Sequence, residues 1–392
     1  MGARAGLTLL ILTLWSAAAN AQAPLSPATP MILTWTPAQQ RQWYPAMETV
    51  FETRTVARGD AVRPLPRARV QIAPTFDLNG RTWTLDDYMA AYSVSGVLVL
   101  KDGKVLLERY GMGRKPSDRW TSFSVAKSVT SILAGAAIQD GRLKLSDLVI
   151  THIPELKGSA YDGVSVRNLM TMSSGVKWNE DYADPTSDIA LAGRVLEPGV
   201  DPFISYVKRL PRAHMPGKTF HYNTSETNLM GIVVARAVGR PLAAYLSEKI
   251  WAPYGMSSSA EWMVDRGGLE LGGCCLSMTL GDYARIGQFM LEGGRIDGKA
   301  VVAPTWIRES TRAQISNGRP APSGCGYFWW IGAEAYEASG IYGQSILVYP
   351  KDRIVVVINA AWPRATGDDL YAPMAAFQGA VRAAANAAGA AP

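Results

Sequence analysis

The sequence predicts an α/β (α+β) fold: an antiparallel sheet built from strands near both ends of the chain, flanked by helices, with an inserted, mainly helical subdomain. Alternating apolar residues, which are typical of strands, occur at 94–110 and return at 326–360, whereas the region between them has mostly helical spacing. No internal repeat of 20–50 residues is present. A sheet that collects both ends of the chain is the simplest arrangement of these segments.

The N-terminus has the pattern of a secretory signal peptide. Arg4 precedes an apolar run from Leu7 to Trp15, and Ala19-Asn20-Ala21 supplies an A-x-A cleavage site. We therefore expect residues 1–21 to be a signal peptide and the mature protein to be periplasmic or secreted. The apolar run is too short to span a bilayer comfortably, so we expect no stable membrane span after cleavage; an uncleaved anchor is the alternative.

After a Pro-rich start, residues 22–90 are expected to form a tether and a wrapping segment. The turn Lys101-Asp102-Gly103-Lys104 lies between two β-rich runs and predicts a hairpin. From Ser124 to Asp140 the apolar residues have helical spacing and stop at Gly141, which predicts a buried helix.

Residues 151–280 are expected to form the helical subdomain. A long helical pattern at 224–250 is broken near Gly239-Arg240-Pro241. In the last third, strands are expected at 326–332, 336–349 and 354–360, followed by an Ala-rich helix from about residue 371. The sheet domain would then comprise residues 91–150 and 281–392.

Composition restricts the classes of function. The chain has 392 residues, 48% of them hydrophobic, and a formal net charge of +6. Its Lys and Arg residues are scattered without a dense run, so no nucleic-acid partner is expected. The histidines lack zinc-site spacing, and neither a metal nor a cofactor is expected.

The three cysteines are Cys274, Cys275 and Cys325. Adjacent cysteines rarely bond to each other, because the ring they would close is strained. We expect three small buried residues. A bond from Cys274 or Cys275 to Cys325 is the alternative in an exported protein.

Ser124-Val125-Ala126-Lys127 at the start of the predicted helix is the first candidate for chemistry. Residues i and i+3 share a helix face, so the lysine amine would lie near the serine hydroxyl and could remove its proton. A helix start also offers positive potential and backbone N–H groups to an oxyanion. A second S-x-x-K at Ser205–Lys208 is interpreted as chance, and an N-cap serine with a solvated lysine is the alternative for the first.

Several segments in order resemble the serine β-lactamase and penicillin-binding-protein superfamily, specifically its class C-like branch with esterases, DD-peptidases and 6-aminohexanoate-dimer hydrolases. The matching segments are Trp120–Ser131 with Ser124 and Lys127, Asn168–Gly175 ("LLTHTSG"), Phe220–Gly231 ("FxYSNxxxxLLG"), and Gly272-Gly273 followed by Met278–Arg285 ("GG…ST..DLAR"). The resemblance spans about residues 90–362 and implies a β-lactamase/transpeptidase-like fold with Ser124 as nucleophile.

The resemblance assigns Tyr222 to proton transfer together with Lys127. A phenol beside a lysine ammonium would have its ionised form favoured, so it could act as general base and then general acid. Thr224 stands where the family has a substrate-binding asparagine, which argues against β-lactam-like recognition.

The family's third motif, K-T-G, is matched best by Ala338-Ser339-Gly340. Ser339 and Gly340 are then expected to border the substrate, and the backbone N–H of Ile341 to be the second oxyanion donor beside that of Ser124. An alternative alignment gives this donor role to Gln344. The missing lysine again argues against penicillin-type substrates.

The polar segment Trp178–Asp188 resembles a loop that lies over the pocket in the 6-aminohexanoate-dimer hydrolase branch. Asp181 and Tyr182 are its candidate substrate contacts, where an acidic group could hold a substrate ammonium; a solvated surface loop is the alternative.

Taken together, these features predict a serine hydrolase that cleaves a small-molecule ester or linear amide through an acyl-enzyme on Ser124. A β-lactamase or DD-peptidase is the alternative enzyme, and a binding or sensor protein of the same fold without turnover is the alternative from another class. No G-x-S-x-G sequence supports a Ser-His-Asp triad. The sequence sets no oligomeric state.

Overall fold

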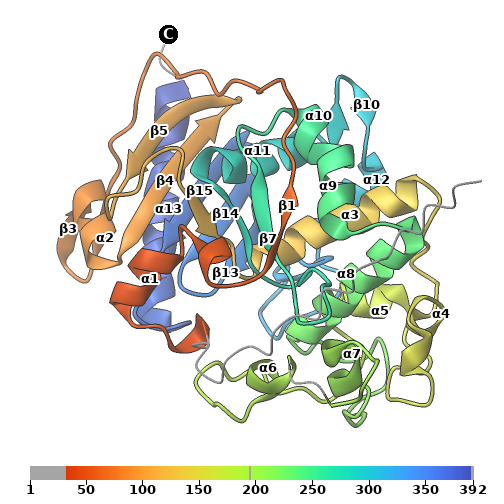
Figure 1. Ribbon diagram of the computed structural model, residues 1–392. Coiled ribbons are helices and arrows are strands. Elements are labelled where there is room, and N and C mark those ends of the chain that lie inside the picture. Colours follow the sequence, from red (N-terminus) through yellow and green to blue (C-terminus); the bar gives the residue numbers. More distant parts are fainter. Residues whose placement is uncertain (1–31, 194–195, 390–392) are drawn as a thin grey trace, which may run out of the picture.

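The fold was analysed in a computed structural model that describes residues 32–193 and 196–389. The expected signal peptide lies outside these residues. The central sheet has seven antiparallel strands in the order β11-β12-β13-β14-β15-β4-β5. Strands from the early and late parts of the chain therefore lie side by side (Figure 1), which confirms the predicted fold. The strands are β4 (Val94–Lys101), β5 (Lys104–Tyr110), β11 (Gly324–Cys325), β12 (Trp330–Ile331), β13 (Tyr336–Gly340), β14 (Gln344–Tyr349) and β15 (Ile354–Ala360).

The predicted hairpin joins β4 to β5. Lys101 pairs with Lys104, and the two turn residues, Asp102 and Gly103, both have positive φ, as a two-residue hairpin turn requires. The expected strand at 336–349 is instead two strands, because the chain reverses at Ile341-Tyr342-Gly343. Gly343 has a φ of 88°, and a Cβ there would lie 2.6 Å from the Trp362 ring. This turn places Ile341 at the end of β13.

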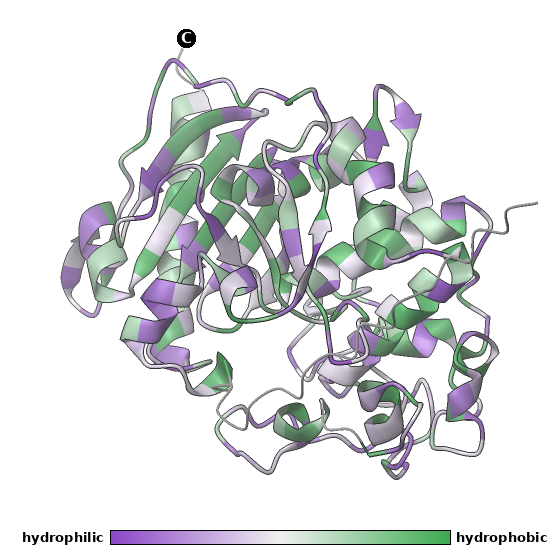
Figure 2. Ribbon diagram, in the orientation of Figure 1, coloured by the Kyte–Doolittle hydropathy of each residue, from purple (hydrophilic) through white to green (hydrophobic). Residues whose placement is uncertain are grey.

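Both faces of the central sheet are buried, and Figure 2 shows its strands as predominantly hydrophobic. Along β15, Val355 and Val357 belong to the core shared with α3 and α11, whereas Val356 and Ile358 belong to the core shared with α13. This alternation follows from the period of two residues in a strand. Here α3 is Val125–Gln139, α11 is Leu280–Leu291 and α13 is Asp368–Gly389.

A smaller four-stranded sheet, in the order β1-β7-β8-β6, leads into the site. Its strands are β1 (Thr53–Val56), β6 (Arg119–Thr121), β7 (Ala260–Met263) and β8 (Leu276–Thr279). Two short hairpins pair β2 (Thr75–Leu78) with β3 (Arg81–Thr84), and β9 (Arg295–Ile296) with β10 (Lys299–Ala300).

The remaining elements are mostly helices between β6 and β7. They are α4 (Val149–His152), η3 (Pro154–Leu156), α5 (Val166–Met170), α6 (Asp188–Leu191), α7 (Pro202–Val207), α8 (Thr224–Val238), α9 (Leu242–Leu246), the π-helical turn η4 (Ser247–Trp251) and α10 (Ala252–Tyr254). Outside this region lie η1 (Ile32–Thr34), α1 (Pro37–Trp43), η2 (Met47–Thr49), α2 (Leu85–Ala91) and α12 (Pro304–Ser310). The predicted break after α8 is confirmed, since its C-cap Gly239 has a φ of 72°.

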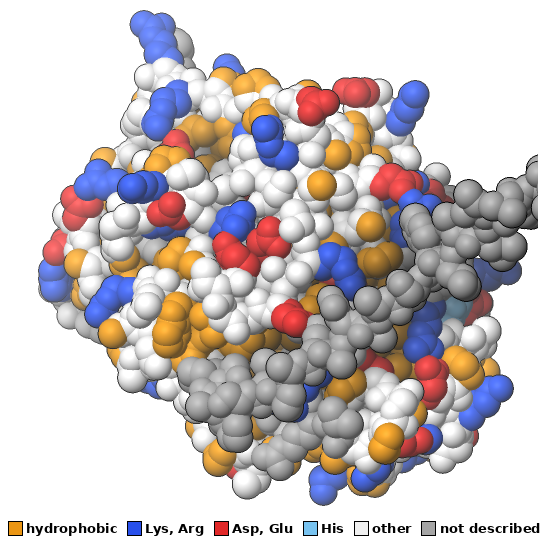
Figure 3. All heavy atoms as spheres, viewed as in Figure 1, with side chains coloured by type: hydrophobic (Ala, Val, Ile, Leu, Met, Phe, Trp, Pro, Cys, Tyr) orange, Lys and Arg blue, Asp and Glu red, His pale blue; other side chains and the backbone are white. Residues whose placement is uncertain are grey.

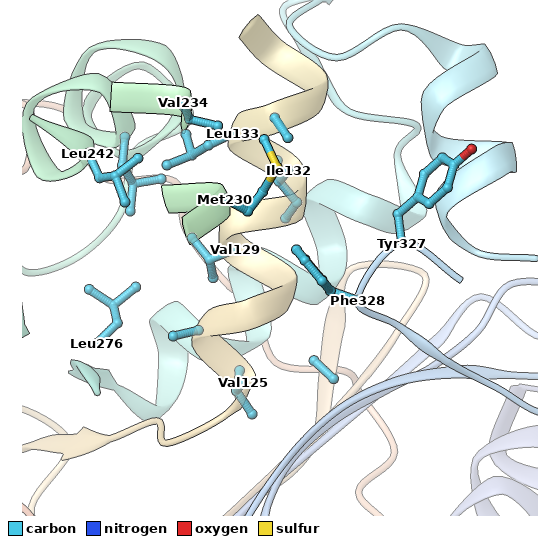
Figure 4. Close-up of a cluster of buried hydrophobic side chains, with 14 of the residues drawn as sticks. Val125, Val129, Ile132, Leu133, Met230, Val234, Leu242, Leu276, Tyr327 and Phe328 are labelled. Atoms are coloured by element: carbon cyan, nitrogen blue, oxygen red, sulfur yellow. The ribbon is translucent and has the colours of Figure 1, made fainter. Parts of the chain in front are cut away.

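The buried helix α3 lies at the centre of the largest core. Val125, Val129 and Leu133 lie on α3 among Met230 and Val234 of α8 (Figure 4), and all of these side chains are buried. Packing on this scale fixes the position of the α3 N-terminus, where Ser124 is the N-cap residue.

The face shown in Figure 3 carries basic and acidic side chains interspersed with apolar ones. Within the part of the chain that the structure describes, no single helix is long and apolar enough to cross a membrane; α8 and the following helix meet the criterion only as a pair bent by 70°, by length and composition alone.

The cysteine prediction is wrong in part. The structure joins Cys274 to Cys275 in a disulfide, and Cys325 is free and buried. The adjacent pair lies in an irregular segment before β8, and Cys275 has a φ of 67°. Because no helix or strand fixes the backbone of these two residues, it can adopt the conformation that a bond between adjacent cysteines requires. A bond from either residue to Cys325 is excluded by this pairing.

Candidate active site

Ser124 lies where β6 ends and α3 begins, with its side chain almost buried. Phe123 before it has a φ of 43°, a left-handed conformation that non-glycine residues seldom adopt. Neighbouring contacts hold this turn, because the Ser122 hydroxyl accepts the Leu276 N–H at 2.9 Å and the Phe123 carbonyl accepts the Cys275 N–H at 3.3 Å. Backbone strain held in this way is a frequent feature of functional sites.

Lys127 and Tyr222 both contact the Ser124 hydroxyl. Lys127 Nζ lies 3.0 Å from Ser124 Oγ, and the Tyr222 hydroxyl donates to the same oxygen at 3.1 Å. Lys127 Nζ also donates to the Gly273 carbonyl at 2.8 Å. The three side chains that the sequence singled out are therefore brought together around one oxygen atom.

The glycine pair before the disulfide makes the contact with Lys127 possible. A Cβ on Gly272 would lie 2.6 Å from the Thr227 carbonyl oxygen, and one on Gly273 would lie 2.9 Å from the Thr224 side chain. Only glycines let this segment pass so close to α8. The carbonyls of Gly272 and Gly273 then accept hydrogen bonds from Thr130 and Lys127 of α3.

Burial lowers the pKa of Lys127 to about 8, and the nearby Glu180 carboxylate opposes this shift. Loss of hydration disfavours the charged ammonium, so a substantial neutral fraction exists at mildly alkaline pH. A neutral lysine amine has a lone pair that can accept the Ser124 proton at the observed separation.

The sequence argument about the acidity of Tyr222 is wrong. Burial, followed by the Glu180 charge, raises the pKa of Tyr222 above its ordinary value, although its hydrogen bond to Ser124 acts in the opposite direction. Lys127 is itself buried and inclined to lose its charge, so it does not supply the fixed positive charge that the argument assumed. Tyr222 is therefore a phenol at neutral pH, with its ring stacked on Trp330 at 5.7 Å.

The end of β13 lies against the start of α3. A Cβ on Gly340 would be 2.7 Å from the Ser122 carbonyl oxygen and 3.1 Å from the Ser124 nitrogen. Among the described residues, the backbone N–H groups of Ser124 and Ile341 have no hydrogen-bond partner. Gln344, whose backbone N–H is the alternative donor, begins β14 opposite Gly340, and its buried side-chain amide donates to the Ala360 carbonyl at 2.7 Å.

Ser339, Gly340, Ile341 and Tyr182 line a cavity beside Ser124. Asp181 and Thr224 do not line it. The Asp181 carboxylate is exposed and accepts the N–H of Ala183, two residues later, in a local turn. The sequence could not distinguish Asp181 from its neighbours, because the direction of a side chain in an irregular loop has no readable period.

Glu180 of the same loop also reaches the site, beside Tyr182, and the sequence analysis missed it. Its carboxylate accepts the Thr224 N–H at 3.0 Å and the Tyr182 hydroxyl at 2.9 Å, and it also bonds to the Thr224 hydroxyl and the Trp178 indole. Both the backbone N–H and the hydroxyl of Thr224 are therefore hydrogen-bonded to Glu180. A single carboxylate in the polar segment Trp178–Asp188 gives no distinctive signal in the sequence, since it equally suits an exposed loop.

The chain is similar to known hydrolases along most of its length. Residues 84–380 match the model of the family described as Beta-lactamase. A 6-aminohexanoate-dimer hydrolase of Paenarthrobacter ureafaciens is 30% identical over 353 residues, which cover 85% of this chain and 88% of that protein.

Solved structures show the same fold. A Bacillus anthracis protein assigned as a 6-aminohexanoate-dimer hydrolase superposes with a TM-score of 0.79 at 22% identity, covering 87% of this chain and 93% of that one. A class C beta-lactamase mutant gives a TM-score of 0.57 at 17% identity, covering 75% and 94%.

Proposed function

This chain belongs to the beta-lactamase family of serine hydrolases, and we propose that it cleaves a linear amide or an ester through an acyl-enzyme formed on Ser124. The observation that carries the proposal is the double contact of Ser124 Oγ with Lys127 Nζ at 3.0 Å and the Tyr222 hydroxyl at 3.1 Å.

In the first step, Ser124 Oγ attacks the substrate carbonyl carbon while its proton passes to neutral Lys127. The proton then reaches the leaving nitrogen or oxygen through Tyr222. Because the pKa of Tyr222 is raised, its hydroxyl is protonated at rest, which suits a proton donor better than a general base. The carbon–nitrogen or carbon–oxygen bond breaks, and the acyl group stays on Ser124. In the second step, water attacks this ester and frees the acid and the serine.

We assign the oxyanion site to the N–H groups of Ser124 and Ile341. The close approach of Gly340 to the Ser124 nitrogen supports this assignment, because it brings the end of β13, which Ile341 follows, next to the Ser124 backbone. Gln344 is a weaker candidate, since it is paired within the sheet and does not line the cavity.

The pocket chemistry favours linear amides and esters over β-lactams. Ala338, at the position of the motif lysine, is buried and brings no positive charge. Glu337 places a carboxyl group in the cavity, where it would oppose the carboxylate of a penicillin-type substrate. The Paenarthrobacter ureafaciens relative is named as a 6-aminohexanoate-dimer hydrolase, an enzyme that cleaves a linear amide. Its name agrees with a preference of this chain for linear amides over β-lactams.

A substrate panel tests the proposal. The purified protein and its Ser124→Ala variant are assayed with p-nitrophenyl esters, linear amides of aminohexanoate type, and nitrocefin. We expect turnover of an ester or amide that Ser124→Ala abolishes, and slow or no turnover of nitrocefin. Fast nitrocefin turnover without ester or amide activity would favour the β-lactamase alternative, and no turnover at all would favour a binding or sensor protein.

We also propose that the catalytic body is exported, on the pattern of residues 1–21. N-terminal sequencing of protein recovered from the periplasm or medium should begin at Gln22. An N-terminus that retains residues 1–21 would contradict it.

A further inference from the structure

Two aromatic residues flank the assigned oxyanion donors in the chain. Phe123 immediately precedes Ser124 and has a φ of 43°, and Tyr342 immediately follows Ile341 and has a φ of 61°. Residues other than glycine seldom adopt this left-handed region, so surrounding contacts must hold it. The backbone at Phe123 directs the peptide group that carries the Ser124 N–H, and Tyr342 fixes the turn that begins directly after β13.

The Tyr44 side chain, from a distant part of the chain, packs on both flanking rings. Its ring centroid lies 5.2 Å from that of Phe123, edge to face at 77°, and 6.1 Å from that of Tyr342. The Phe123 and Tyr342 rings are themselves 5.1 Å apart, so the three rings form one cluster. Aromatic pairs attract each other at such separations. One side chain therefore bridges the segment before α3 and the turn after β13.

Tyr44 is itself held against the strand that leads to Ser124. It is the C-cap residue of α1 and is fully buried. Its backbone carbonyl accepts the Thr121 N–H at 3.0 Å, and its ring lies edge to face with Trp120 at a centroid distance of 5.6 Å. Both of these residues belong to β6. Contacts of its backbone and its ring together give Tyr44 a fixed position behind the site.

The turn at Tyr342 is tied to the same N-terminal segment. The Tyr342 hydroxyl donates to the Leu33 carbonyl at 2.8 Å, and Tyr44, Phe123, Ile341 and Tyr342 all belong to one buried cluster. Within the part of the chain that the structure describes, no residue before Ser124 lines the cavity beside it. The segment therefore acts on the site from behind, without contact to a substrate.

We propose that Tyr44 is a positioning residue of the oxyanion site; this rests on the proposed hydrolysis at Ser124 and on the assigned donors. The Tyr44 ring holds Phe123 and Tyr342 so that the N–H groups of Ser124 and Ile341 point to one carbonyl oxygen of the substrate. Without the ring, a cavity forms behind both donors and the left-handed backbone can relax. The donors then lose the alignment that stabilisation of an oxyanion requires.

Two esters test the proposal: p-nitrophenyl butyrate and its thiono analogue, in which sulfur replaces the carbonyl oxygen. Sulfur is a weak hydrogen-bond acceptor, so an aligned oxyanion site prefers oxygen. Relative to alkaline hydrolysis, wild-type kcat/KM should favour the oxygen ester by about 100-fold or more, the effect of a lost oxyanion donor. Tyr44→Ala should reduce this ratio by about tenfold or more. Tyr44→Phe, which keeps the ring, should retain the wild-type ratio.

Trp43→Ala is the matched control from the same N-terminal segment. Trp43 ends α1 and packs on Trp35 at a centroid distance of 5.0 Å. Among the ring contacts of the described residues, Trp43 has none with Phe123 or Tyr342. Trp43→Ala should therefore lower the melting temperature, as Tyr44→Ala does, and leave the ratio of the two esters unchanged.

The ratio of two substrates does not depend on the amount of folded protein. A Tyr44→Ala enzyme that keeps the wild-type ratio, or a Trp43→Ala enzyme that loses it equally, would overturn the proposal, because Tyr44 would then contribute only packing. A wild type without preference for oxygen would also overturn it.

Failure of the proposed function is distinguishable, because neither ester would then show turnover that Ser124→Ala abolishes. If Tyr44→Ala does not fold, Tyr44→Leu decides, since it keeps an apolar side chain but not the ring. Its ratio should fall about threefold or more, as loss of aromatic contacts predicts, and an unchanged ratio would refute the positioning role.

Discussion

Glu180 holds Thr224 by two hydrogen bonds, one from the Thr224 backbone N–H at 3.0 Å and one from its hydroxyl. The contact ties the loop at 178–188 to the start of α8, two residues after Tyr222. It also brings a negative charge close enough to raise the pKa values of both Lys127 and Tyr222. Glu180 therefore couples the position of this loop to the protonation of Lys127 and Tyr222.

Glu180→Gln should shift the acidic limb of the kcat/KM profile to lower pH. In the proposed mechanism the neutral form of Lys127 is the active base, so activity should rise as pH increases through its pKa of about 8. Removing the negative charge disfavours the ammonium and lowers this pKa. Asp181→Asn, at an exposed neighbouring carboxylate, should leave the limb in place. An unshifted limb in Glu180→Gln would disprove the coupling.

Tyr222→Phe should reduce kcat by about 100-fold or more, because it removes one proton-transfer group. The ring can keep its stacking on Trp330, so the fold should be preserved. Steady-state assays and circular dichroism would check both expectations. A Tyr222→Phe enzyme with wild-type kcat would remove Tyr222 from the mechanism.

Gly340→Ala should lower kcat at least 100-fold by forcing β13 away from α3. The new methyl group would lie 2.7 Å from the Ser122 carbonyl oxygen and 3.1 Å from the Ser124 nitrogen, so the two oxyanion donors would separate. Gly332→Ala is the matched control, because a Cβ there has only an ordinary contact at 3.5 Å. Equal activity in the two variants would argue against the assigned oxyanion site.

Glu226→Gln should flatten the dependence of stability on pH. Burial raises the pKa of Glu226 to about 8 from 4.5, although the Ser174 hydroxyl donates to it at 2.6 Å. The folded protein thus keeps a proton that the unfolded chain has released, so stability falls as pH rises from about 4.5 toward about 8, by several kcal/mol. Thermal melting at pH 5 and pH 8 should show a smaller loss in the variant; an equal loss would contradict the raised pKa.

The sequence was sufficient for the parts of the site that lie on regular structure. Helical spacing places Ser124 and Lys127 on one face of α3, which is a consequence of the fixed period of the helix. The resemblance in ordered motifs added Tyr222, Ser339, Gly340 and Ile341.

The remaining features depend on contacts between distant segments. Glu180 reaches the site through an irregular loop, and its partner Thr224 is 44 residues away in sequence. In the sequence, Glu337 is one residue of an alternating strand. Its position in the cavity depends on α13, whose residues line the same cavity. The pKa of Tyr222 follows from burial, which spacing alone does not reveal.

Intact-mass analysis after treatment with a fluorophosphonate tests the central claim most directly. We predict one adduct on the wild type, none on Ser124→Ala, and an unchanged adduct on Ser205→Ala, since Ser205 of the second S-x-x-K is fully buried and its hydroxyl donates to the Pro202 carbonyl at 2.9 Å. An adduct that persists in Ser124→Ala, or its absence from the active wild type, would contradict Ser124 as the nucleophile.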